Sequence, residues 1–135
     1  MHTVFSAALA LVLLIGGSVA PTSAQSALTK RDGQGPVAVV VTLMEATGSG
    51  IRAKVVLDTH SVALDGIAFE QAVRLRRPDG TEIAPVAVEG ASGAGHHREA
   101  VVKFPAIDGA TAVHIVVKDV GGIAERAFRW ALPLQ

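Results

Sequence analysis

The side chains best suited to chemistry in this sequence are histidines in two short segments, Asp-Thr-His-Ser at 58–61 and Gly-His-His-Arg at 95–98. Imidazole is the commonest protein ligand for divalent transition metals, and two or three imidazoles can form a site. If the strand before His60 continues, Asp58 and His60 project on the same side. The Gly-rich stretch before His96 and His97 can bend them inward. This pattern predicts zinc or copper(II) held by His60, His96 and His97, with Asp58 as a ligand or as a carboxylate that orients one.

The same histidines also fit a plainer interpretation. Paired histidines in loops are often solvated, and His60 could bond local backbone in a turn. The distance between the two segments matches no metal-binding fingerprint. A thioether copper(I) site is disfavoured because Met44 is the one methionine beyond the first residue. His114 falls on a strand face that we expect to be exposed, so we place it outside any site.

No enzyme is predicted. Asp58, His60 and Ser61 have the residue types of a hydrolase triad, but adjacent strand residues point to opposite faces. The sequence has no Gly-x-Ser-x-Gly elbow around a nucleophile. A water-activating metal with an open position is the one catalytic route that the residues leave open.

Arg126 and a set of four other arginines need an explanation in any fold. Arg126 shares a strand face with Phe128 and Trp130, which should be buried, so it needs a carboxylate partner or a position at the rim. A structural ion pair is the favoured interpretation, and anion binding is the alternative. The arginines at 74, 76, 77 and 98 could form a modest basic patch, but strand alternation scatters the first three over both faces.

Composition excludes several classes of partner. The 12 basic and 12 acidic side chains balance, and no polybasic run occurs, which disfavours nucleic acid and anionic membrane surfaces. The chain has no Cys, which removes thiol catalysis, thiolate metal sites and a lipoprotein anchor. Tyr is absent and Trp occurs once, so a stacking platform for bases or sugars is not expected.

The first residues have the layout of an export signal. An apolar run at 4–15 is followed by Gly16, Gly17 and small residues up to Ala24. We therefore predict a signal peptide over 1–24 and a periplasmic or secreted protein. The run is too short for a membrane span, although the lack of Lys or Arg before it leaves a retained anchor as the alternative. Residues 25–35 are polar and Gly-containing, and we expect a flexible lead-in.

From Pro36 onward the pattern predicts strands. Short runs rich in Val, Ile and Thr are separated by Gly, Pro and Asp, and no helix is expected. The expected strands are 37–44, 51–58, 69–77, 83–89, 99–104, 112–120 and 123–132. The domain at 36–135 is therefore predicted to be an all-β antiparallel sandwich of about seven strands. Its broad architecture would be immunoglobulin-like, with a small β-barrel as the alternative.

Three segments together resemble a family of small exported bacterial β-sandwich proteins to which no activity attaches. These segments are Asp-Thr-His-Ser-Val-x-Leu at 58–64, Gly-His-His-Arg leading to Phe104, and Glu-Arg-x-Phe-x-Trp at 125–130. The resemblance implies that the His60 and His96–His97 segments belong together. The family pattern has an acidic residue at Ala63 and Gly at Ala100, and the first departure weakens a ligand role for that loop.

Two functions are therefore expected. The first is an exported binding module that holds zinc or copper(II) through the histidine cluster. The second is a structural or protein-interaction domain of the cell envelope that has no metal and uses sheet edges or an exposed apolar face.

Overall fold

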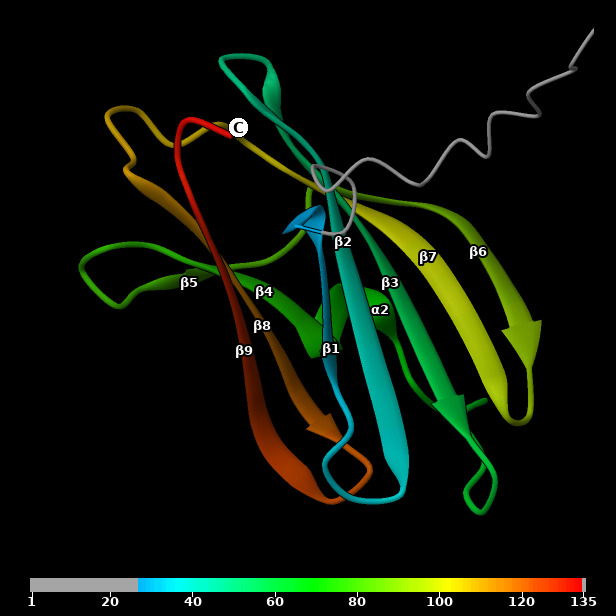
Figure 1. Ribbon diagram of the computed structural model, residues 1–135. Coiled ribbons are helices and arrows are strands. Elements are labelled where there is room, and N and C mark those ends of the chain that lie inside the picture. Colours follow the sequence, from blue (N-terminus) through cyan, green and yellow to red (C-terminus); the bar gives the residue numbers. More distant parts are fainter. Residues whose placement is uncertain (1–26, 135) are drawn as a thin grey trace, which may run out of the picture.

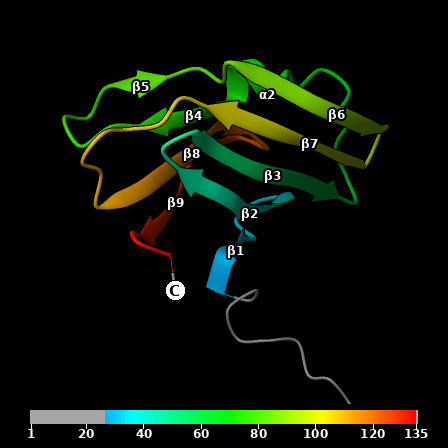
Figure 2. The ribbon, with the colours of Figure 1, turned by 90° about the horizontal axis from the view of Figure 1, so that it is seen from above.

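The computed structural model describes residues 27–134, which form two antiparallel sheets packed face to face (Figure 1). One sheet has the strand order β1-β2-β3-β7-β6 and the other the order β5-β4-β8-β9. Seen from above, the two layers stay separate and do not close into a barrel (Figure 2). The predicted all-β sandwich is confirmed. The strands are β1 Thr29–Asp32, β2 Val37–Thr47, β3 Gly50–Thr59, β4 Val73–Arg76, β5 Glu82–Ile83, β6 Ala87–Ala94, β7 His97–Phe104, β8 Ala112–Val120 and β9 Ile123–Ala131.

Several elements differ from the predicted ones. Part of the predicted flexible lead-in pairs with β2 as strand β1. The prediction of no helix is wrong, because Phe69–Ala72 forms the short helix α2 before β4. The run at 83–89 splits into β5 and the start of β6, and β6 then continues through the Gly-rich stretch expected to be a loop. The predicted signal peptide at 1–24 lies outside the described residues.

Alternation along each strand builds the core. In β3, Ile51, Ala53, Val55 and Leu57 are buried, whereas the residues between them are half exposed. The inner faces of both sheets contribute to one apolar cluster that includes Phe69, Phe128 and Trp130 among its larger members. Full burial of each Val, Leu, Ile or Phe side chain stabilises the fold by about 1.5–3 kcal/mol.

Arg126 is the largest side chain with almost no exposure, and it lies among the apolar residues of β9. Its guanidinium donates to the carbonyl oxygens of Val120 at 2.9 Å, Gln34 at 2.7 Å and Val37 at 3.0 Å. Its Nε lies 3.6 Å from a carboxylate oxygen of Asp32. The arginine thus joins the β8–β9 turn of one sheet to the β1–β2 connection of the other. The predicted carboxylate partner is present, but backbone carbonyls supply the hydrogen bonds.

Strand β6 is an edge strand with an irregular backbone. Its pairing with β7 shifts register between Glu89 and Ser92. Gly93 has a φ of 86°, and a Cβ built on it would lie 2.2 Å from the carbonyl oxygen of His97. Glycine is therefore required where this hairpin narrows.

Substitution of Arg126 by methionine should destabilise the fold by about 3 kcal/mol or more, because three buried carbonyl groups lose their donor. Chemical denaturation measures the free energy of unfolding. An Arg31→Met variant on the exposed face of β1 is the matched control, and it should change stability by less than about 0.5 kcal/mol. Equal stabilities of the two variants would contradict a structural role for Arg126.

Candidate functional site

Of the predicted metal ligands, the structure brings Asp58 and His97 into contact. They are paired residues of β3 and β7, and a ring nitrogen of His97 lies 2.5 Å from an Asp58 carboxylate oxygen. The other ring nitrogen lies 3.6 Å from a carboxylate oxygen of Glu99. The hydrogen bond that the His97 imidazole donates to the Asp58 carboxylate raises the pKa of His97 above its ordinary value, with a smaller contribution from Glu99. His97 belongs to a strand and not to the loop that the sequence suggested.

His60 and His96 lie at the same end of this sheet but do not complete a cluster. The backbone N–H of Thr59 donates to the carbonyl oxygen of His96 at 3.0 Å, which brings the two loop segments side by side. Both histidines are exposed. Within residues 27–134, no three His, Asp or Glu side chains are placed to hold a metal ion. Zinc or copper(II) binding through all four residues therefore stays a prediction.

Arg98 anchors the loop that follows β3. Its guanidinium donates to the carbonyl oxygens of Leu64, at 3.0 Å, and of Ile67, and it lies 5.0 Å from the ring centre of Phe69. The Leu64 N–H donates to the Gly95 carbonyl at 2.8 Å, and the Gly95 N–H donates to Asp65 at 3.0 Å. These hydrogen bonds hold together the two segments that carry the histidines, and the contacts support the fold.

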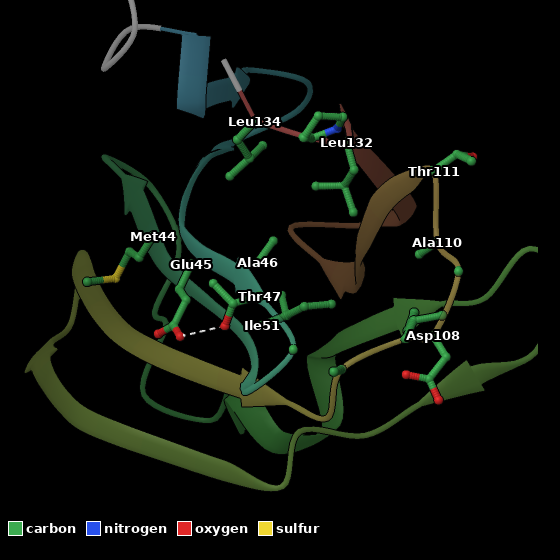
Figure 3. Close-up of a pocket in the computed structure, with 15 residues that line it drawn as sticks. Met44, Glu45, Ala46, Thr47, Ile51, Asp108, Ala110, Thr111, Leu132 and Leu134 are labelled. Carbon is green, nitrogen blue, oxygen red and sulfur yellow. Dashed lines mark hydrogen bonds between the residues drawn. The ribbon is translucent and has the colours of Figure 1, made fainter.

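The opposite end of the sandwich carries a groove of about 820 Å³. Ala46 and Ile51 form one side of it, and Leu132 and Leu134 of the C-terminal segment approach from the other (Figure 3). The loop at 106–111 between β7 and β8 closes the third side. The groove lies where both sheets end and is not covered by any other described element.

The groove combines apolar walls with acidic charge. Among the described residues that line it, Glu45 and Asp108 are acidic and none is basic. Glu45 accepts a hydrogen bond from the Thr47 hydroxyl at 3.0 Å, shown dashed in Figure 3. An apolar segment that carries a positive charge matches this lining, because it would both cover the walls and compensate the carboxylates.

Two large apolar side chains are strongly exposed on this end of the molecule. Met44 is 47% exposed and Val86 is 70% exposed. Met44 lines the groove, and Val86 lines a neighbouring cleft that shares Glu45 and Ile51 with it. The two exposed side chains therefore lie in adjacent hollows at one end of the sandwich.

Sequence reasoning did not predict this groove. Met44 ends the predicted strand 37–44, and in the structure a register shift between Leu43 and Glu45 leaves it without a partner on β3. A bulge inserts one residue and redirects its side chain. The loop at 106–111 and the C-terminal leucines meet β2 through tertiary packing, which strand periodicity does not show.

Sequence reasoning also left out the outer face of the second sheet. Arg76 pairs with Glu82 at 3.0 Å and with Glu125, and Lys118 pairs with Glu82 at 2.5 Å. Val116 shares this face and has no exposed surface, so these long side chains cover it. His114, placed outside any site from the sequence, lies beside this network, opposite Arg129 of β9.

Comparisons with family models, with curated proteins and with solved structures give no match to this chain. Over the described range, none of the helices has the length and apolar character needed to span a membrane.

Replacing Asp58 by asparagine should lower the pKa of His97 toward its ordinary value near 6.5, because the carboxylate is the largest cause of its elevation. A raised histidine pKa stabilises the folded state below the ordinary value, and this contribution is lost as pH rises through the elevated pKa. Asp58→Asn should therefore destabilise the protein more in mildly acidic than in alkaline buffer. NMR titration of the imidazole signals measures the pKa, and Glu99→Gln should have a smaller effect. An unchanged pKa in Asp58→Asn would contradict the pairing.

Proposed function

We propose that this chain is a non-catalytic binding module of the cell envelope that receives an apolar, positively charged segment of a protein partner in the groove at the end of the sandwich. The observation that carries this proposal is a partly exposed apolar lining, which includes Met44 and Leu134, combined with acidic residues and no basic ones among the described lining residues. The export signal predicted over 1–24 supports an envelope location.

The open shape of the groove, rather than its volume, favours a peptide segment over a small molecule. It is an open trough that extends from Met44 across Ile51 to Asp108 and Thr111, bounded by strand ends and loops. Small-molecule sites enclose most of the ligand surface, whereas peptide grooves leave one side of the ligand in solvent. An extended segment with alternating apolar and basic side chains could place the apolar ones against the leucines and the basic ones near Asp108.

Two fluorescent hexapeptides test this proposal. One alternates valine with lysine, and the other has glutamate in place of each lysine. Fluorescence polarisation should show that the lysine peptide binds and that the glutamate peptide does not. Binding of the lysine peptide should weaken about tenfold or more in Leu134→Ser and in Asp108→Lys, because the first removes apolar contact and the second reverses charge.

Glu70→Lys on α2 is the matched control for Asp108→Lys, because it makes the same charge reversal at an exposed site away from the groove. This variant should bind the lysine peptide as the parent protein does. Equal loss in both charge variants would show general electrostatic attraction and would contradict a site in the groove. Failure of the lysine peptide to bind the parent protein would also overturn the proposal.

Zinc or copper(II) binding is the second function that we propose. Its support is that all four predicted ligands lie at one end of the first sheet, with Asp58 already against His97 and the backbone of Thr59 bonded to that of His96. A metal would have to compete with Asp58 and Glu99 for the ring nitrogens of His97, and His60 and His96 would have to turn toward it.

Calorimetric titration of the protein without a tag, with zinc and copper(II) separately, tests this second function. Specific binding should be stoichiometric and should be lost in a triple variant with His60→Ala, His96→Ala and His97→Ala. His114→Ala is the matched control and should retain binding, because it removes a histidine on the other sheet. Equal weak binding by the parent and the triple variant would exclude the metal site.

A further inference from the structure

A cation-rich pocket of about 300 Å³ opens on the outer face of the second sheet. Arg76, Arg77 and Arg129 contribute guanidinium groups, and His114 and Thr111 contribute an imidazole and a hydroxyl. No carboxylate is present among the described residues that line it. The pocket is distinct from the groove of the proposed function, although Thr111 borders both.

The elements that form the pocket come from three separate parts of the chain. His114 and Arg129 are directly opposed on β8 and β9. Arg76 ends β4, and Arg77 begins the turn at 77–81, whose geometry is set by hydrogen bonds from the Arg77 N–H to the Thr81 carbonyl and from the Gly80 N–H to the Arg77 carbonyl. The sheet and a tight turn hold the backbone of these elements, so binding has to order only the arginine side chains.

The neighbouring carboxylates already have partners. Glu82 and Glu125 pair with Arg76, and Glu82 also pairs with Lys118. Asp79 accepts hydrogen bonds from the Thr81 N–H at 2.9 Å and from its hydroxyl at 2.7 Å. Across the described part of the chain, no carboxylate forms an ion pair with Arg77 or Arg129. Their hydrogen-bond donors therefore remain available.

The pKa of His114 reflects the charges around the pocket. Partial burial lowers its pKa first, and the charges of Arg76 and Arg129 lower it further, whereas Glu125 and Glu82 act in the opposite direction. These effects favour the neutral imidazole, and the acidic side chains oppose the arginine charges around it. An anion bound in the pocket would add negative charge beside the ring and raise its pKa.

We propose that this pocket binds an oxyanion, namely the phosphate or carboxylate group of a small ligand. The planar guanidinium groups match both by paired N–H donors, and the Thr111 hydroxyl and the His114 imidazole add further donors at the rim. The volume admits one such group with a small attached body. Phosphate and carboxylate share the chemistry that the pocket recognises, and the experiment distinguishes them.

NMR titration of the whole chain with inorganic phosphate, and separately with succinate, tests this proposal at constant ionic strength held with sodium chloride. At least one anion should give saturable shifts at His114 and the amides around Arg77 and Arg129, with a dissociation constant of about 1 mM or lower. The pKa of His114 should rise as the pocket fills. Saturation by phosphate alone assigns a phosphoryl ligand, by succinate alone a carboxylate ligand, and by both a general oxyanion site.

Arg77→Gln and Arg129→Gln should each weaken binding about tenfold or more, because each removes a charged donor that has no carboxylate partner. Arg31→Gln on exposed β1 is the matched control and should bind as the parent does. The near-ultraviolet circular dichroism of Trp130 checks that each variant keeps its fold. Unsaturable shifts of equal size in all four proteins would show only an ion atmosphere and would overturn the proposal, as would no response to either anion.

Discussion

The guanidinium of Arg126 determines how the two sheets meet at one end of the sandwich. It donates to carbonyl groups on both sides of the interface and has no exposed side-chain surface. A buried charge of this kind is tolerated because three carbonyl groups accept its hydrogen bonds and the Asp32 carboxylate lies near its Nε, which itself makes no hydrogen bond. Hydrogen bonds from one guanidinium to several carbonyl groups permit few other arrangements of the strands. They fix the approach of β9 to the β1–β2 connection, while the apolar core supplies most of the stabilisation.

The two ends of the molecule use arginine and apolar side chains in opposite ways. At one end, Arg126 and Arg98 point inward and bond to backbone carbonyls, so the loops there are tied together. At the other end, Met44 and the C-terminal leucines leave apolar surface open. This difference between the two ends is why we propose the groove, rather than the histidine end, as the site for a peptide segment.

Strand periodicity was enough to predict the architecture. Alternation in 51–58 and the run at 112–120 correspond to β3 and β8 because one face of each strand is buried. Periodicity places Met44 on the side of β2 opposite Leu43 but does not show whether other elements cover that side, so the groove was missed. It also could not show that His114 and Arg129 would be neighbours, since that pairing depends on the register of two strands. In the predicted metal site, the contact between Asp58 and His97 also depends on the register of two strands, β3 and β7. It does not depend on bending of the Gly-rich loop, which the sequence suggested.

Strand β6 borders open solvent, and a regular edge strand there would offer a row of backbone groups to a second molecule. The register shift after Glu89 and the narrow hairpin at Gly93 break that row. Only one of the eight residues of β6 is charged, so charge repulsion contributes little to this protection. At this side of the sheet, backbone shape rather than charge is therefore the feature that disfavours edge-to-edge pairing with a second molecule.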